Sequence, residues 1–154
     1  MTRRGLSPVL GTVVLLAITV ALASVVGMAV GAYGTDTPTP RVDLTASADA
    51  TADSITITHR QGESLDIEAL DLQIRIDGQP LDHQPPVPFF AAEGFHSGPT
   101  GPFNSASTDP WSAGESATLR LASTNAPLLS EGSTVTIELT HDRAVLATLT
   151  VTAT

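Results

Sequence analysis

The chain has 154 residues, with seven arginines, no lysine and 16 acidic residues, and its formal net charge is −9. With Arg3 and Arg4 set aside, residues 6–154 hold five arginines and 16 acids, a net charge of −11. Such a surface repels nucleic acid and anionic lipid, which argues against both as partners of the soluble part. The absence of cysteine excludes a disulfide framework and a thiolate metal site.

The avoidance of lysine together with an excess of acids suits a protein that stays hydrated in concentrated salt, where its self-repulsion is screened. This composition predicts a halophilic source, most naturally an archaeon. A GC-rich genome that favours arginine codons is the alternative explanation.

The N-terminal region predicts a membrane-spanning helix. Arg3 and Arg4 come first, and no charged residue follows from Gly5 to Thr35. The apolar body, residues 8–33, would form a helix of ~39 Å at ~1.5 Å per residue, longer than the ~30 Å hydrocarbon core of a bilayer. Because the two arginines precede the helix, we expect them to stay in the cytoplasm while the rest of the chain is exported.

A secretory signal peptide is the alternative for this region. A small-x-small cleavage site is available at Ala21-Leu22-Ala23. The apolar run continues through residues 24–32, however, so a mature chain starting at Ser24 would keep an adhesive apolar tail. We therefore favour the spanning helix.

Small residues recur along this helix at intervals of four. Ala17 and Ala21 form one such series, and Ala23, Gly27 and Gly31 form another, with a Gly-x-x-x-Gly pair at its end. Small residues at this spacing lie on one side of a helix and allow a second helix to approach closely. The alternative is that the helix has no helical partner, since glycine and alanine are common in spanning segments.

The remaining residues predict a single β domain. A Thr/Pro-rich linker covers residues 34–40, and about 120 residues follow the helix, enough for one core and not for two. Segments with strict apolar–polar alternation predict strands with one buried and one exposed face. These segments are residues 41–46, 54–59, 70–76, 117–121, 134–140 and 145–151, the last two joined by a short hairpin connection. We predict an α+β protein: a long N-terminal hydrophobic helix, then a small antiparallel β-sandwich.

Between the third and fourth of these strands lies an irregular stretch, residues 80–113. It contains seven of the 11 prolines and five of the six aromatic residues. Long irregular segments in a compact domain are uncommon, and they are usually functional or disordered. One interpretation is that the aromatic side chains close an open end of the sandwich. The other is that part of the stretch contacts a neighbouring subunit or an outside partner.

We expect the aromatic residues of this stretch to divide between these two roles. Trp111 should be structural, because it leads directly into the turn before a strand. Phe89 and Phe90 are the candidate contact residues, because the proline-rich residues 85–88 hold the preceding chain extended.

The segment Arg4-Gly5-Leu6-Ser7-Pro8-Val9-Leu10-Gly11 resembles the N-terminus of archaeal type IV pilins, haloarchaeal ones in particular. The resemblance implies that a membrane prepilin peptidase cuts between Gly5 and Leu6, and that the exposed helices then bundle into the core of a filament. It divides the chain into a leader (1–5), a filament-core helix (6–33), a linker (34–40) and an extracellular head (41–154).

Two turns of the head resemble motifs of the same family. His59-Arg60-Gln61-Gly62-Glu63 is similar to a His-x-Gly-Gly-acidic segment that follows a strand, and implies a structural role for His59, Gly62 and Glu63, with His59 tying the turn to a backbone carbonyl. Residues 111–115 are similar to a second Gly-acidic turn. Gln61 stands where the family has glycine, and Leu10 stands where bacterial type IV pilins have glutamate, so a filament of this chain could not set its register with that carboxylate.

No catalytic, cofactor or metal site is predicted. The histidines His59, His83, His96 and His141 lack ligand spacing, and no nucleophile elbow or calcium loop is present. Neither asparagine, Asn104 or Asn125, lies in a glycosylation sequon. We therefore expect a protein that is not an enzyme.

The favoured function is a structural subunit of a type IV pilus-like surface filament that supports adhesion. Its partners would be identical or related pilin subunits, the prepilin peptidase and, before assembly, the membrane, in which the precursor has a cytoplasmic N-terminus. The alternative is a membrane-anchored monomeric binding module that displays its head outside the cell and never polymerises.

Overall fold

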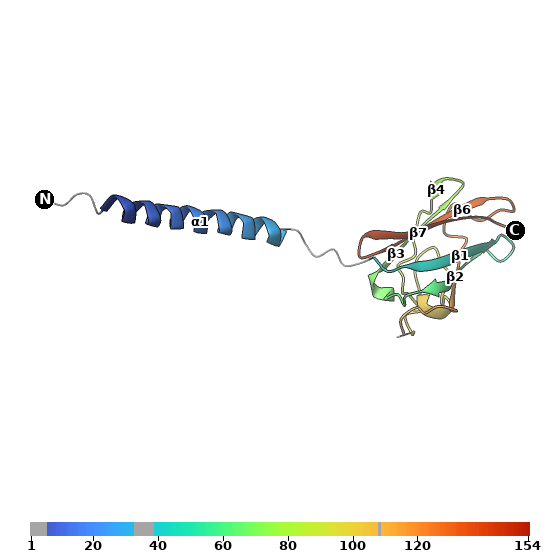
Figure 1. The fold of residues 1–154 in the computed structure, drawn as a ribbon. Helices are drawn as coiled ribbons and strands as arrows, with labels where there is room; N and C mark the ends of the chain where they lie inside the picture. The colour runs from blue at the N-terminus through green and yellow to red at the C-terminus, as the bar shows by residue number, and fades with distance from the viewer. Residues whose placement is uncertain (1–5, 33–38, 108) are drawn as a thin grey trace. The chain divides into compact units, whose positions relative to one another are not determined.

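The computed structural model describes residues 6–32, 39–107 and 109–154. It contains two compact units, a helix and a head domain, and each is described by itself (Figure 1). The helix α1 (Leu6–Ala32) has 27 residues, a length of ~40 Å at ~1.5 Å per residue. The predicted leader and residues 33–38, which include most of the predicted linker, lie outside the described residues.

The head contains two antiparallel sheets. One has the strand order β1-β2-β5, formed by β1 (Val42–Asp49), β2 (Ser54–Gly62) and β5 (Ser116–Arg120). The other has the order β4-β3-β6-β7, formed by β4 (Gln79–Pro80), β3 (Leu70–Ile76), β6 (Thr134–His141) and β7 (Ala144–Thr152). Each strand predicted from alternation is present, and the α+β prediction is confirmed.

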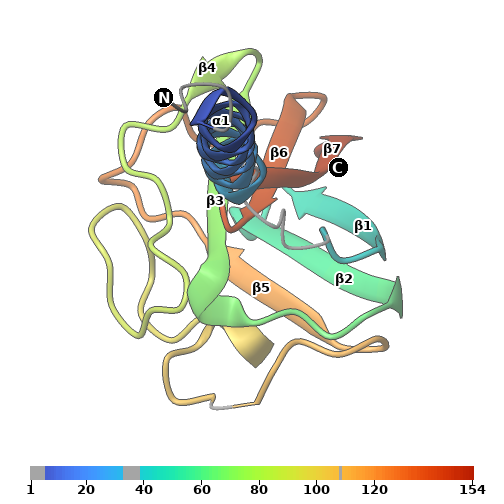
Figure 2. The same cartoon turned by 60° about the vertical axis from the view of Figure 1, so that its left-hand side comes forward.

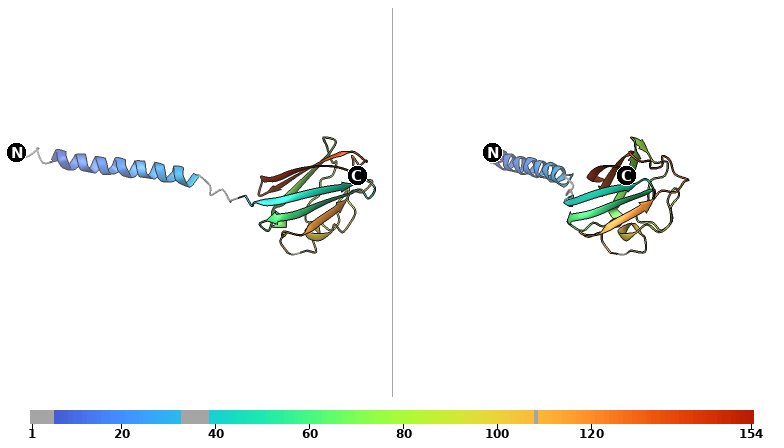
Figure 3. Two further views of the ribbon diagram at one scale, coloured as in Figure 1. Left: turned by 45° about the vertical axis from the view of Figure 1, so that its right-hand side comes forward. Right: turned by 90° about the vertical axis from the view of Figure 1, so that its right-hand side faces the viewer.

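Alternating side chains place one apolar core between the sheets. In β3, the buried residues Leu70, Leu72, Ile74 and Ile76 alternate with exposed polar residues. The buried faces of the two sheets contribute to the same core, and Figures 2 and 3 show the sheets facing each other. This core is what fixes the loops and turns described below.

The hairpin between β6 and β7 has a tight turn at Asp142 and Arg143. Both residues have positive φ, at 48° and 70°. Two successive positive φ values are typical of a type I′ turn, whose twist matches that of the two strands it joins. The predicted short hairpin connection is therefore present.

The irregular stretch folds back onto the sheet β1-β2-β5. It contains the 3-10 turn η2 (Gly101–Phe103), and its backbone pairs with β5 at Thr100 and Thr118. Phe95, Phe103 and Trp111 are buried in the core. The interpretation that aromatic side chains close one side of the head is correct for these three residues.

The expectation that Phe89 is exposed is wrong. Its side chain is 5% exposed and lies against Phe95, with 5.6 Å between ring centroids. The N–H of Phe89 donates to the carbonyl oxygen of Phe103, so residues 89 and 90 continue an extended segment that pairs with the chain around η2. Successive side chains of an extended segment point to opposite sides, which buries Phe89 and leaves Phe90 61% exposed.

Candidate assembly helix and head turn cluster

The side-chain hydroxyls described in α1 are hydrogen-bonded to the backbone of the same helix. Thr12, Thr19 and Ser24 each donate to a backbone carbonyl one turn earlier, at 2.9, 2.8 and 2.8 Å. The segment Val9–Val26 contains no charged residue, and it is long and apolar enough to cross a membrane. The same satisfied, apolar surface suits contact with other helices.

Of the predicted processing and packing residues, Leu6, Ala23, Gly27 and Gly31 lie in this helix. Leu6 is the first residue of α1, while Gly5 lies outside the described residues. Ala23, Gly27 and Gly31 are all helical, and the Ala23 side chain is exposed. These three residues are therefore spaced at intervals of four along one helix.

The head brings the two predicted turn motifs together. The His59 ring is fully buried in β2, and its Nδ1 lies 3.2 Å from the carbonyl oxygen of Trp111. Because a carbonyl only accepts, Nδ1 carries the proton and donates. The His59 ring is thus bonded to the backbone carbonyl of a residue 52 positions away.

Trp111 connects this contact to the core. Its ring meets the rings of His59 and Phe103 edge to face, at centroid distances of 5.7 and 5.3 Å. The indole N–H donates to the carbonyl oxygen of Glu115 at 3.2 Å, and the same oxygen accepts the backbone N–H of His59 at 2.9 Å. The turn of residues 111–115 is thus hydrogen-bonded within itself, from Trp111 to Glu115, and is also bonded to His59.

The Gly62-Glu63 turn holds the start of the head domain. A carboxylate oxygen of Glu63 accepts the backbone N–H of Arg41 at 2.9 Å, and the N–H of Glu63 donates to the carbonyl oxygen of Arg41 at 3.1 Å. Gly62 has a φ of +120°, and a Cβ there would lie 2.2 Å from the Arg41 carbonyl oxygen. Only glycine fits this close approach of two backbones.

We call these residues, His59, Gly62, Glu63, Trp111 and Glu115, the turn cluster. Glu115 acts like Glu63, since its carboxylate accepts the backbone N–H of Ser112 at 2.7 Å. Each acidic side chain of the cluster therefore satisfies a backbone donor. The cluster stabilises the end of the head where the chain leaves the linker.

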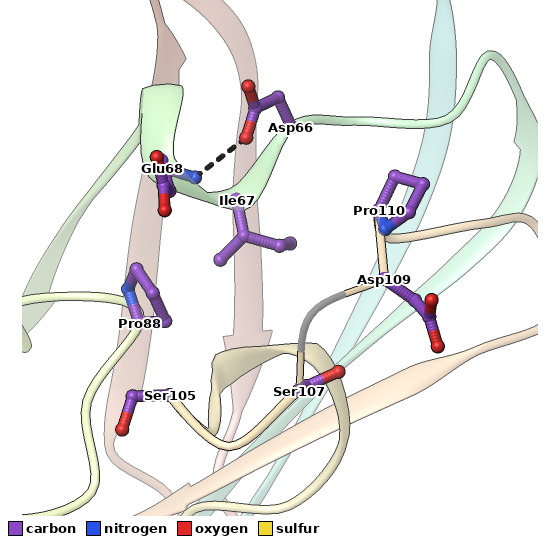
Figure 4. A pocket seen from close by; sticks show the side chains of 8 residues that line it. All are labelled: Asp66, Ile67, Glu68, Pro88, Ser105, Ser107, Asp109 and Pro110. Carbon is purple, nitrogen blue, oxygen red and sulfur yellow. Dashed lines mark hydrogen bonds between the residues drawn. The ribbon is translucent and has the colours of Figure 1, made fainter.

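A shallow groove of about 490 Å³ lies beside the 3-10 turn η1 (Ile67–Ala69). Figure 4 shows its lining residues, which are Asp66, Ile67, Glu68, Pro88, Ser105, Ser107, Asp109 and Pro110. One oxygen of Asp66 accepts the backbone N–H of Glu68, which makes it the N-cap of η1. Within residues 6–32, 39–107 and 109–154, no three His, Cys, Asp or Glu side chains are grouped to hold a metal ion.

Asn125 is a structural residue that the sequence analysis did not identify. It is 3% exposed, and its amide donates to the carbonyl oxygens of His83 and Gly94 at 3.0 and 3.2 Å. Its side-chain oxygen accepts the backbone N–H groups of His83 and Ala126. Asparagine before Ala-Pro predicts a turn, but nothing local indicates partners more than 30 residues away.

The comparison with known families bears on the N-terminal unit. Residues 4–44 match the family model of the archaeal type IV pilin N-terminal region. This segment of the chain is therefore similar to the N-terminal segment of archaeal type IV pilins. The match covers α1 and the linker and ends within β1 at Leu44, so it includes the Arg41 that the turn cluster holds.

A search of the curated proteins found no match to this chain. The family match ends at Leu44, and the rest of the head consists of two antiparallel sheets, a buried aromatic cluster and the turn cluster at the linker end.

Proposed function

We propose that this chain is a pilin, a structural subunit of an archaeal type IV pilus-like filament that supports attachment to surfaces. The observation that carries the proposal is the uninterrupted, uncharged helix α1, directly preceded by Arg3-Arg4-Gly5 and joined to an acidic head. Helices removed from the membrane would bury one another, at ~25 cal/mol per Å² of apolar surface. The acidic heads would form the hydrated outer wall.

Removal of the leader is the step that separates this proposal from a membrane-anchored monomer. An arginine at the centre of a bilayer costs about 2.5–3.5 kcal/mol on insertion scales, so a subunit that keeps Arg3 and Arg4 is held in the membrane. A subunit that begins at Leu6 has lost both arginines, and its helix has no charged side chain, so the new α-amino group at Leu6 is the charge that remains at this end. We propose that prepilin peptidase performs this cleavage in the membrane, and that the mature head then lies outside the cell.

The test is the N-terminal sequence of the full chain recovered from membranes and from sheared surface filaments. We expect filament protein to begin at Leu6, and Gly5→Val to stay uncleaved in the membrane because the branched side chain blocks the peptidase. Gly11→Val is the matched control: it makes the same substitution in the same segment, where a Cβ meets nothing within 4 Å. It should be cleaved normally.

Two results would contradict the proposal. Surface protein that retains Met1 or Thr2 would favour the anchored monomer. Surface protein that begins at Ser24 would indicate ordinary secretion.

A further inference from the structure

A small pocket lies at the edge of β5, between this strand and residues 96–100 of the irregular stretch. Two backbone hydrogen bonds of 2.9 Å hold the segment to the strand, from the His96 N–H to the Arg120 carbonyl oxygen and from the Thr100 N–H to the Thr118 carbonyl oxygen. Between these two bonds the segment has three residues and the strand has one, so the segment bulges away from the strand. The bulge leaves a pocket of about 260 Å³, lined by residues 96–100, Thr118 and Arg120, which we call the β5 pocket.

The β5 pocket contains a cation on a head that is otherwise acidic. Residues 39–154 carry five arginines and 15 acids. None of the described residues that line the pocket is acidic. The ion pairs among the described residues are made by His83 and His141, so the Arg120 guanidinium has no carboxylate partner in this part of the chain. An unpaired guanidinium in a pocket is suited to bind an anionic group.

The side chains of the pocket present hydrogen-bond donors to such a group. The Nε–H of Arg120 donates to the carbonyl oxygen of Ala52 at 3.3 Å, which orients the guanidinium and leaves its two amino groups for a ligand. The Thr100 hydroxyl accepts the N–H of Thr118 at 3.2 Å, so its own hydrogen is available to donate. The His96 imidazole adds a donor, because one ring nitrogen carries a hydrogen in either tautomer.

An exposed aromatic ring borders the same pocket. Phe90 is 61% exposed, and of the aromatic side chains that the structure describes it alone is on the surface. Its carbonyl oxygen accepts the N–H of Gly98 at 2.7 Å. A Cβ placed on Gly98 would lie 3.9 Å from Cε2 of the Phe90 ring, so the ring lies beside a residue that lines the pocket. Apolar surface next to a few convergent polar groups is typical of a ligand site.

We propose that the β5 pocket binds an acidic sugar unit, at the end or at a branch of an outside polysaccharide. The carboxylate of a uronic acid accepts paired hydrogen bonds from Arg120, and its hydroxyls meet the hydroxyl of Thr100. The C–H face of the sugar ring packs on the electron-rich face of Phe90. One sugar unit suits the volume of the pocket, since sites for drug-sized ligands are larger, at ~300–1,000 Å³.

Charge and surface together select this ligand. A nucleic acid would bring many phosphates near the 15 acids of the head, whereas a terminal sugar acid brings one charge. An inorganic anion would pair with Arg120 and leave Phe90 without a contact. A neutral sugar would leave the guanidinium unpaired. That the polysaccharide belongs to a surface to which filaments attach rests on the proposed function, but the binding itself needs only one head.

The direct test titrates the purified full-length chain, in detergent micelles, with methyl glucuronide and follows binding by NMR. The methyl ester of the same sugar is the matched ligand, because it keeps the ring and the hydroxyls and removes the charge. We expect the glucuronide to bind at least about tenfold more tightly than the ester, since a hydrogen bond to a charged group is lost.

Substitutions separate the cation from the aromatic ring. Arg120→Gln should weaken binding at least about tenfold. Arg75→Gln is the matched control, because Arg75 is an exposed strand arginine in the other sheet and its loss changes the net charge equally. It should leave the affinity unchanged. Phe90→Ser should weaken binding about fivefold, whereas Phe90→Tyr, which keeps the ring, should bind like the unmodified chain.

The outcomes separate this proposal from the filament function. Equal binding of the glucuronide and its ester, or equal losses for the two arginine variants, would overturn the sugar site. Inorganic sulfate that binds as tightly as the glucuronide, with no effect of Phe90→Ser, would also overturn it. Filaments that attach to surfaces although the chain binds no glucuronide would leave only the filament function standing. Glucuronide binding by a chain that never leaves the membrane would support the site and overturn the filament function.

Discussion

Truncation of the Trp111 side chain should remove a large part of the stability of the head. Trp111 is fully buried, and its ring contacts both His59 and Phe103. Replacing a buried tryptophan by alanine costs ~3–5 kcal/mol, because the apolar contacts are lost and a cavity remains. Small domains are stable by only ~5–15 kcal/mol in total, so Trp111→Ala should leave the head marginal.

The corresponding change in Tm follows from the size of the domain. The head, residues 39–154, is intermediate in size between domains of about 100 residues and domains of about 150 residues. For a domain of this size, a loss of ~1 kcal/mol in the free energy of unfolding lowers Tm by ~4 °C. A loss of ~4 kcal/mol therefore lowers Tm by about 16 °C. The assay is thermal unfolding of the head, residues 39–154, followed by far-UV circular dichroism, since Trp111 is the only tryptophan and its fluorescence is lost with it.

Two further variants provide the controls. Trp111→Phe keeps an aromatic ring but loses the indole N–H, while the Glu115 carbonyl oxygen keeps its bond from the His59 N–H. It should cost ~1–2 kcal/mol. Phe90→Ser changes an exposed side chain and should stay within ~0.5 kcal/mol. Equal shifts for Trp111→Ala and Phe90→Ser would refute the division of this stretch into core and surface.

Three other substitutions test the turn cluster, the buried amide and the helix. Gly62→Ala should destabilise the head by at least ~2 kcal/mol more than Gly114→Ala in urea unfolding. Both glycines have positive φ, but only at Gly62 would a Cβ lie against the Arg41 carbonyl oxygen. Equal losses of stability would argue against that clash. Asn125→Ala should lower the free energy of unfolding by ~2–4 kcal/mol in the same measurement, because it leaves several buried backbone groups unpaired. A loss below ~0.5 kcal/mol would show that water replaces the amide. Gly27→Leu should lower filament yield without impairing membrane insertion, since leucine is favourable in lipid, whereas an unchanged yield would mean that Gly27 does not contact a neighbouring helix.

The strands could be predicted from the sequence because their signal is local. A strand such as Leu70–Ile76 alternates strictly, and the burial of every second side chain follows from the two-residue repeat. The helix could be predicted for the same reason, because an uncharged apolar run of this length is typical of a membrane-spanning helix.

The loop side chains could not be predicted in the same way. Phe89 and Phe90 are adjacent and chemically identical, and what separates them is the pairing of Phe89 with Phe103 and Asn104. Asn125 is buried because His83 and Gly94 converge on it from another loop. Such contacts depend on how distant segments meet, and a single sequence carries no local sign of them.

The positions of Arg41 and Thr154 determine how the head responds to a pulling force. Glu63 holds Arg41, the residue just before β1, while Thr154 is bonded to Ala48 and Ala50 at the other end of this strand. Tension applied between these two points acts along the strands. The hydrogen bonds between β1 and β2 are then loaded in shear and must break together, whereas bonds that are peeled apart break one after another. A head pulled from residues 39 and 154 in an optical trap should therefore extend in one step at high force, and Glu63→Ala should lower that force by freeing Arg41, the residue before the strand.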